Sequence, residues 1–520
     1  MRADMKVNKM IPAGLLLVLI GISCILLVNS RWGIGVTHDS IFYLSSAGNL
    51  ARDHGLQWSG SDGGLHPLTH FPPFYPLIIA LFMAFGFPDV RAATWFAAIL
   101  LGLNLFASGY LVYYFSKSKI LPAFTALVLA ASVGFVNLHL VALSEPLFIG
   151  LMLISIGVLG VYFERPSMKL LLAATLLAAS SILTRYIGIT VIATGFLSIA
   201  ALETTPFRTR LKNLLLYAGI SLAPILLWGV RNYIMAGSTT NRALIYHSLE
   251  WGNRKLGFET ITGWFIPGAV SYKSTIAISG LFLAALFFWW LWLGWKLVIS
   301  RSVNPGKAGA YRIAFMFNLF SLVYLAGILF SLTFFDASTR LDGRILAPVY
   351  VAFVCAFFTM VGSLSIRWQA IGVAVSIVIM ALSGPTSVRS FSDFLENGIG
   401  FSGRDWQSSQ AVTYVRDAPQ ESVIYTNQGM ALYFLTQRPV YDIPEQMDVV
   451  RNVVRDGYPA QLNLMADRLK MPSSFIVWFA GGGLSDSVLK EAGLDLQAYK
   501  EFPDAFILAT AENLKNGSLP

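Results

Sequence analysis

The chain has 520 residues, of which 55% are hydrophobic and only 12% charged, and its formal net charge is +9. Soluble proteins carry about 25% charged residues, so the composition excludes an ordinary soluble enzyme and favours a membrane protein. The positive charge does not indicate nucleic-acid binding, because the basic residues fall in short clusters between apolar runs and do not line one amphipathic face.

Long apolar runs recur along most of the chain. A bilayer is spanned by about 20 apolar residues, and ionised side chains are costly inside it. We therefore predict a polytopic α-helical membrane protein. Its transmembrane helices, about 11 in number, are expected near residues 11–28, 92–115, 120–138, 146–163, 169–183, 186–202, 213–230, 275–298, 313–333, 345–362 and 369–385. The first run is taken as an uncleaved helix, because no small-residue cleavage site precedes Arg31.

One further apolar run, 74–87, is only about fourteen residues long and follows Pro72 and Pro73. It is too short to cross a bilayer, so we expect a helix lying in the membrane interface. Counting it as a span would also move Lys117 and Lys119 to the outer face, against the positive-inside rule.

Basic residues favour one orientation of these spans. With the N-terminus in the cytoplasm, every predicted inner loop and its flanks are basic. After the first span, the basic residues in the predicted inner loops and their flanks are Lys117, Lys119, Arg165, Lys169, Arg208, Arg210, Lys212, Lys296, Arg301, Lys307, Arg312 and Arg367. Three longer regions then face outward: 29–91, 231–274 and everything after about 386. We expect an integral protein of the cell's inner (plasma) membrane.

The chain changes character after the last apolar run. Charges return, strand-like runs occur at 422–426, 438–443 and 474–479, and Gly429–Thr436 is expected to be a short helix. We predict a transmembrane module over residues 1–385 and an extracytoplasmic α/β domain over residues 386–520, a size that can fold on its own.

Six ionisable residues from distant parts of the chain map to the outer ends of predicted spans, where an extracytoplasmic site could form. They are Asp39, Glu145, Arg185, Arg231, Arg340 and Arg344. Asp39 precedes a helix expected over 40–53 and could be its N-cap or a general base for an acceptor hydroxyl. Glu145 precedes Pro146 and could be a helix-start residue or could support the base or bind the acceptor.

The two late arginines also allow two interpretations. Arg340 and Arg344 could be ordinary interfacial arginines paired with Asp336 and Asp342. Alternatively they could hold a phosphate, for which the forked guanidinium is well suited. We predict no cofactor. His38, His66 and His70 could together hold a divalent metal, but their spacing across a proline-rich loop is not a metal signature.

Local patterns on the predicted outer face resemble a known family. An Asp follows the first span and precedes an interfacial helix, here Asp39 with Tyr43. A proline-rich apolar stretch, His70–Leu77, comes late in the same loop, and Arg91 follows at the start of the next span. Such patterns resemble the GT-C superfamily of membrane glycosyltransferases.

A third pattern is a late outer Arg before a Leu-x-Pro-type sequence, here Arg344 before Leu346, Ala347 and Pro348. With it, residues 1–385 are most similar to the GT-C branch that contains protein O-mannosyltransferases and the lipid A aminoarabinose transferase. Ile345 replaces the tyrosine that the family often carries, and the preceding Asp-Gly is unusual, which leaves open which arginine binds phosphate.

The resemblance implies sugar transfer at the outer leaflet, from a polyprenyl-phosphate-linked donor to a glycan, lipid or protein acceptor, with inversion. Asp39 would be the base and Glu145 would support it. The leaving phosphate is a stable anion and needs electrostatic stabilisation only. The candidate substrate-binding residues are Arg344, Arg340, Arg91, Arg185, Arg231, Tyr43 and His70. A transporter or flippase of lipid-linked sugars is the main alternative, although transporters place ionisable residues near the bilayer midplane in repeated halves. A membrane scaffold without catalysis is a second.

Overall fold

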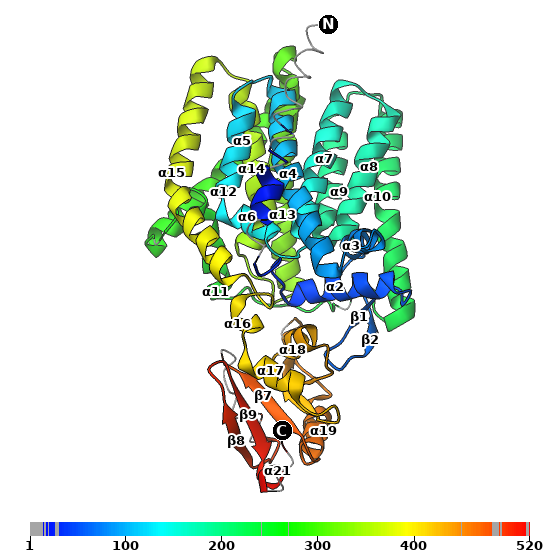
Figure 1. The fold of residues 1–520 in the computed structure, drawn as a ribbon. Helices are drawn as coiled ribbons and strands as arrows, with labels where there is room; N and C mark the ends of the chain where they lie inside the picture. The colour runs from blue at the N-terminus through cyan, green and yellow to red at the C-terminus, as the bar shows by residue number, and fades with distance from the viewer. Residues whose placement is uncertain are drawn as a thin grey trace.

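The computed structural model describes residues 14, 17–18, 20–26, 31–240, 242–268, 270–448, 450–480, 488, 491–515 and 519. Figure 1 shows a body of long helices running side by side, with a smaller domain beyond one end. The helices of the body are α4 (Asp89–Ser116), α5 (Leu121–Ala130), α6 (Val133–His139), α7 (Glu145–Glu164), α8 (Met168–Thr184), η1 (Tyr186–Gly188), α9 (Ile189–Leu202), α10 (Phe207–Ala236), α11 (Trp251–Gly263), α12 (Tyr272–Gly294), η2 (Trp295–Ile299), η3 (Pro305–Lys307), α13 (Ala308–Phe334), α14 (Gly343–Gly362) and α15 (Ile366–Asn397).

Seven of the described helices are long and apolar enough to cross a membrane, or eight if the bent pair α5 and α6 is one span. That pair is broken by 72°. Two predicted spans correspond to the shorter apolar helices α8 and Tyr186–Leu202. Of the span predicted at 11–28, residues 14, 17–18 and 20–26 are described, and all of them are helical. The polytopic helical architecture is confirmed and the chain is an integral membrane protein, while the count of 11 stays a prediction.

The loop that was predicted to be the first outer loop forms its own small layer at the end of the body. It contains α2 (His38–Ala51), the antiparallel strands β1 (Gln57–Ser59) and β2 (Leu65–Pro67), and α3 (Phe74–Ala84). In Figure 1, α2 lies across the ends of the long helices, on the side of the smaller domain. The expected helix at 74–87 is present as α3, and Pro73 is its N-cap residue. Its place in the membrane interface stays a prediction.

The smaller domain is built on a five-stranded sheet with strand order β4-β3-β7-β9-β8. Strands β3 and β4 and strands β3 and β7 pair in parallel, whereas β9 is antiparallel to both β7 and β8. The expected strand-like runs correspond to β3, β4 and β7, and the predicted helix is confirmed as α18. The elements are α16 (Arg404–Gln407), α17 (Gln410–Asp417), β3 (Ile424–Thr426), α18 (Gly429–Thr436), β4 (Tyr441–Asp442), β5 (Met447–Asp448), β6 (Val453–Val454), α19 (Tyr458–Leu469), β7 (Phe475–Phe479), β8 (Leu496–Glu501), β9 (Ala505–Thr510) and α21 (Ala511–Lys515).

The segment before α2 joins the two parts of the molecule. Gly35 forms a parallel bridge with Val141, just before α7, and Val36 forms one with Gly400, just after α15. Gly400 has φ +62, and a side chain there would meet the Val36 carbonyl, so this close approach requires glycine. The segment that leads into α2 is therefore tied by backbone hydrogen bonds to the residues before α7 and to those between α15 and α16.

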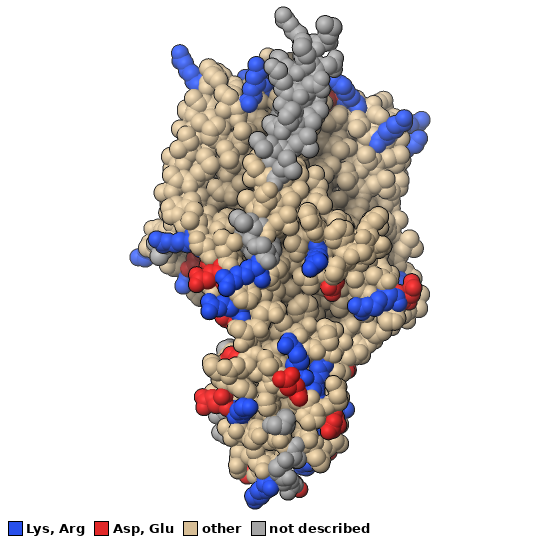
Figure 2. All heavy atoms as spheres, viewed as in Figure 1, with Lys and Arg blue, Asp and Glu red and all other residues tan. Residues whose placement is uncertain are grey.

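Charge is distributed unevenly between the two ends of the helical body. Figure 2 shows lysine and arginine side chains standing out at the end far from the smaller domain, whereas acidic and basic side chains mix around α2 and the smaller domain. The basic end includes the loops between α4 and α5 and between α7 and α8, with Lys117, Lys119, Arg165 and Lys169. This is the asymmetry that the positive-inside rule describes.

Candidate active site at the α2 end of the helical body

Asp39 stands in the first turn of α2, but it does not cap the helix. Thr37 is the N-cap residue, and the Ser40 side chain accepts a hydrogen bond from the Thr37 backbone N–H at 3.0 Å. The Asp39 carboxylate instead forms an ion pair with Arg344, the second residue of α14. Because a neighbouring pair caps the helix, the Asp39 side chain is available for another role. It is 28% exposed and can be reached from outside.

Glu145 and two arginines complete the charged cluster around Asp39. Arg344 donates from Nε to Glu145 Oε1, and Arg185 Nη1 lies 2.7 Å from the same oxygen. The Glu145 side chain is only 2% exposed. Arg344 is therefore shared between Asp39 and Glu145, and Glu145 between Arg344 and Arg185. A buried carboxylate needs such partners, because an isolated ion in a low-dielectric interior is strongly unfavourable.

The start of α14 explains the Asp-Gly that departs from the family pattern. Asp342 is the N-cap residue, and its Oδ1 accepts from the backbone N–H groups of Arg344 at 3.0 Å and Ile345 at 3.2 Å. The interpretation that Asp342 pairs with an arginine side chain is thus replaced by a capping role. Since Asp342 already satisfies two N–H groups at this helix start, an incoming anion would depend more on arginine side chains than on the helix end.

Tyr43 lies one turn after Asp39 on α2 and connects the cluster to α7. Its hydroxyl is 3.0 Å from Ser144 Oγ, which also accepts from Arg185 Nη1 at 3.1 Å. The side chain is fully buried, and burial raises the pKa of Tyr43. At neutral pH it is therefore a neutral hydrogen-bonding group that holds α2 against the start of α7.

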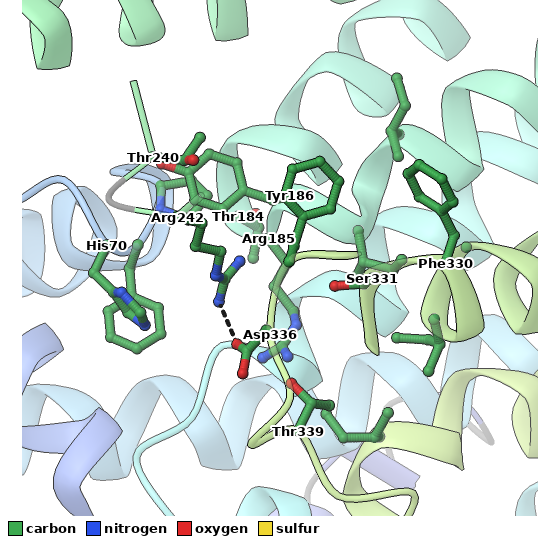
Figure 3. Close-up of a pocket in the computed structure, with 18 of the residues that line it drawn as sticks. His70, Thr184, Arg185, Tyr186, Thr240, Arg242, Phe330, Ser331, Asp336 and Thr339 are labelled. Atoms are coloured by element: carbon green, nitrogen blue, oxygen red, sulfur yellow. Dashed lines mark ion pairs between the residues drawn. The ribbon is translucent and has the colours of Figure 1, made fainter. Parts of the chain in front are cut away.

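A cavity of about 330 Å³ opens beside this cluster. Its wall includes Arg185, the ion-pair partner of Glu145, and Ile345, which follows Arg344 in the chain. Its polar side also carries Tyr43, His70 and an Arg242–Asp336 ion pair at 3.1 Å, which Figure 3 shows as a dashed line. Its lining also includes the apolar residues Ile187, Ile189, Gly327, Ile328 and Phe330. The cavity thus combines two arginines with apolar residues from η1, α9 and α13, in the size range of small-ligand sites.

His70 lines the cavity as a neutral group. Its ring is edge-to-face with Phe71 at a centroid distance of 4.7 Å. Burial lowers the pKa of His70, and the neighbouring Arg242 lowers it further. It can donate or accept a hydrogen bond at neutral pH, but it adds no positive charge to the two arginines.

Three sequence-predicted residues lie away from the cluster. Arg231 donates to the backbone carbonyls of Leu68 at 2.7 Å and Leu56 at 3.1 Å, so it fastens the first outer loop to α10. Arg91 is exposed in the first turn of α4, and Arg340 is exposed before α14. Their roles in substrate binding stay predictions.

Arg242 is a site residue that the sequence did not reveal, and Asp336 pairs with it and not with Arg340 or Arg344. Arg242 lies in the outer region 231–274, which carries several basic residues without a distinguishing motif. The signal that could have found it was Asp336, the first acid after a long acid-free stretch. It is only 5% exposed, and a buried acid requires a cationic partner.

Among the described residues, no group of three or more His, Cys, Asp or Glu side chains is placed to hold a metal ion. The three histidines of the outer loop diverge. The His38 ring packs edge-on against Phe401 at 4.9 Å, and His66 stacks beside Trp58 at 4.8 Å, whereas His70 faces the cavity.

Comparison of the whole structure with known proteins gives clear matches. ArnT from Cupriavidus metallidurans, in a crystal structure with bound undecaprenyl phosphate, matches with a TM-score of 0.59 and 16% identity over 95% of this chain and 97% of ArnT. The oligosaccharyltransferase AglB from Archaeoglobus fulgidus, in complex with an inhibitory peptide and a dolichol-phosphate, matches with a TM-score of 0.53 and 12% identity. That match covers 90% of this chain and 69% of AglB. Both are GT-C glycosyltransferases.

The chain has the GT-C fold. No protein-family model matches its sequence, and no curated protein matches it by sequence. The predicted resemblance to GT-C proteins is therefore confirmed at the level of the fold. Within this GT-C fold, Asp39, Glu145, Arg185 and Arg344 meet at the end of the helical body that carries the smaller domain.

Proposed function

We propose that the protein is a GT-C glycosyltransferase that moves a sugar from a polyprenyl-phosphate-linked donor to an acceptor hydroxyl at the extracytoplasmic face. One observation carries the proposal: the reachable carboxylate Asp39 is paired with Arg344 beside a cavity lined by two arginines and by apolar side chains. A general base next to a site for an amphipathic anion is what this reaction needs. The two matched structures contain polyprenyl phosphates, undecaprenyl phosphate and dolichol-phosphate, which supports the same donor class.

The chemistry would be a single displacement. The acceptor oxygen attacks the anomeric carbon while the bond from that carbon to the phosphate oxygen breaks, and the electron pair leaves with the polyprenyl phosphate. Asp39 takes the proton of the acceptor hydroxyl. Arg185 and Arg242 line the cavity, and Arg344 shares Glu145 with Arg185, so these arginines would stabilise the charge that develops on the departing phosphate. One displacement inverts the anomeric configuration.

Glu145 would have a supporting role. By pairing with both Arg344 and Arg185, it sets the direction of the two guanidinium groups and compensates part of their charge. Because Arg344 is shared with Asp39, a donor phosphate that draws Arg344 toward itself would release the Asp39 carboxylate to accept the proton. Donor binding and activation of the base would then occur together.

The orientation belongs to the proposal, because flipped donors are used at the outer leaflet. Basic residues at the end far from the smaller domain support an N-terminus in the cytoplasm and residues 386–520 outside. A C-terminal reporter that is active only in the cytoplasm should therefore stay silent. A strong signal from that reporter would place Asp39 on the wrong side for this reaction.

The activity can be tested with purified protein in nanodiscs and a panel of radiolabelled polyprenyl-phosphate sugars, by following release of polyprenyl phosphate. We expect release from at least one donor, and we expect Asp39→Asn to lower it about 10²- to 10⁴-fold. Glu203→Gln, at the opposite end of the helical body, is the matched control and should retain it. Equal release by the wild type and Asp39→Asn, or none from any donor supplied with protein, lipid and glycan acceptors, would refute the proposal.

A further inference from the structure

A second and larger cavity, about 1000 Å³, lies where the first outer loop meets the smaller domain. We call it the interdomain groove. One wall is the β1–β2 hairpin, with Trp58, Ser61 and His66, and the other includes the carboxyl ends of β3 and β4. In open α/β sheets, ligands bind outside the carboxyl ends of parallel strands. The groove is therefore where a ligand of this domain would be expected.

The two walls are fixed to each other. Ser61 Oγ donates to Asp442 Oδ2 at 2.6 Å, and the Val440 backbone N–H donates to the Ser61 carbonyl at 2.8 Å. Asp442 Oδ1 in turn accepts from the Gly429 N–H at 3.1 Å. These bonds hold the groove open in a defined shape, so a ligand would lose little free energy in organising it.

The charged groups of the groove have neighbouring partners, and their charges nearly balance. Glu445 lies 3.3 Å from Arg455, Asp62 lies 3.7 Å from His66, and the Arg468 guanidinium stands 4.4 Å from the centroid of the Tyr441 ring. Three carboxylates and two guanidinium groups line the site in total, so no strong field of one sign remains to select an ion. The ligand that fits is neutral but rich in hydrogen-bonding groups.

The remaining lining supplies what a sugar chain uses. The Trp58 and Tyr441 rings are partly covered by neighbouring side chains, and the parts that remain exposed can pack against the apolar faces of sugar rings. Gln428 and Gln461 add amides, each of which can donate and accept at neighbouring hydroxyls. An extended polypeptide fits less well. It would bind by adding a strand to the sheet edge, but the edge strand β4 has two residues and is flanked by the Val440–Ser61 bond.

The groove lies close to the proposed base, Asp39. Phe42 lines the groove and lies three residues after Asp39, so the two side chains share one face of α2. The Phe42 ring is 4.5 Å from that of Trp58 on the groove side and 6.4 Å from that of His70, which lines the smaller cavity. A molecule bound in the groove would thus lie one aromatic side chain away from the arginine-containing cavity.

We propose that the interdomain groove binds a neutral oligosaccharide. This inference rests on the proposed function for its role: the oligosaccharide is the part of the acceptor remote from the reacting hydroxyl. The acceptor class is then a glycan, and the smaller domain serves to select and hold it.

The test measures binding apart from catalysis. Full-length Asp39→Asn protein in nanodiscs is titrated calorimetrically with α-linked hexose, β-linked hexose and N-acetylhexosamine tetrasaccharides, and with a neutral decapeptide. We expect at least one tetrasaccharide to bind and the peptide not to bind. Added Tyr441→Ala should weaken that binding about five- to tenfold, the scale of one lost aromatic contact. Added Gln461→Ala, an exposed helix position, should weaken it about threefold through one lost hydrogen bond.

Tyr499→Ala is the matched control, since Tyr499 is 41% exposed on β8, at the opposite edge of the sheet from β4. Failure of every tetrasaccharide to bind, binding of the peptide instead, or equal weakening by Tyr499→Ala would overturn the inference. The two proposals fail separately. If a donor is turned over but no oligosaccharide binds, the proposed binding site fails and the proposed enzymatic activity stands. If an oligosaccharide binds and its binding depends on Tyr441, but no donor is turned over, the proposed activity fails and the binding site stands.

Discussion

Two buried glutamates at opposite ends of the helical body are held in contrasting ways. Glu145 begins α7 and is bound by Arg185 and Arg344 beside a cavity. Glu203 lies at the other end, where its Oε1 accepts from Tyr162 near the end of α7 at 3.1 Å and from Asn213 at 2.7 Å. One carboxylate therefore has cationic partners and the other has neutral ones.

The difference separates a structural network from a reactive one. Neutral donors hold only the Oε1 atom of Glu203, and they add no positive charge that could bind an anionic ligand. Around Glu145, the arginines are shared between acids, so a bound phosphate can replace one acid as the partner of a guanidinium group. Burial alone does not distinguish these two glutamates, whereas the charge of their partners does.

Loss of Asp39 should have the largest effect in the charged cluster of Asp39, Glu145, Arg185 and Arg344. Asp39→Asn removes the proton acceptor, and we expect turnover to fall about 10²- to 10⁴-fold, the usual contribution of a general base. Donor affinity should hold or rise, because Arg344 loses a competing carboxylate. Since Thr37 and Ser40 cap α2, thermal unfolding should change little. Turnover within twofold of the wild type would remove Asp39 from the mechanism.

Arg344 should matter next, through the donor. Arg344→Ala should weaken binding of a polyprenyl-phosphate sugar about 10- to 100-fold, the scale of a lost charge-assisted hydrogen bond. Arg344→Lys should retain part of it, because the charge stays and the forked geometry is lost. Arg340→Ala is the control, because Arg340 is exposed, and should change donor affinity less than twofold. A larger effect of Arg340→Ala than of Arg344→Ala would reverse the assignment.

The two glutamates can be compared directly by isosteric substitution. Glu145→Gln removes the charge that compensates Arg185 and Arg344 and should lower the free energy of unfolding by about 1.5–3 kcal/mol, with a clear loss of turnover. In Glu203→Gln, the amide oxygen can still accept from Tyr162 and Asn213, so turnover should stay within twofold and stability should hold or rise. Both are read by thermal unfolding and by donor release. Equal losses in the two variants would contradict the proposed difference between Glu145, with its cationic partners, and Glu203, with its neutral partners.

The smallest expected effect is a pH dependence at His70. Its pKa is lowered in the folded protein, so the unfolded chain binds the proton more readily. The stability contributed by neutral His70 is therefore complete above the unfolded pKa of about 6.5 and is lost as pH falls through the folded pKa. His70→Gln should lose less stability than the wild type between pH 7 and pH 5, measured by thermal unfolding. His66→Gln, at an exposed histidine, serves as the control, and a slope unchanged by His70→Gln would contradict this account.

The sequence supported the architecture and the main members of the site, for reasons that are local. Apolar run length and basic loops revealed the helices, and the scarcity of acids made Asp39 and Glu145 conspicuous. The pairing of these residues could not be derived, because it depends on how α2, α7 and α14 pack together. Arg242 was missed for the same reason. Arg231, although at the predicted end of α10, binds backbone carbonyls, and a helix end alone does not show which way a side chain turns.

The bridge at Gly35 and Val36 also limits how the molecule can be recombined. Three chain segments, before α2, before α7 and after α15, meet there as neighbouring rungs. Asp39 lies three residues after that junction, so the position of its carboxylate depends on all three segments. A chimera that exchanges the smaller domain with that of another GT-C protein would have to carry residues 34–36 and 140–142 along with residues 399–402. An exchange made at the end of α15 alone would replace Gly400 and so would disturb its bridge with Val36, three residues before Asp39.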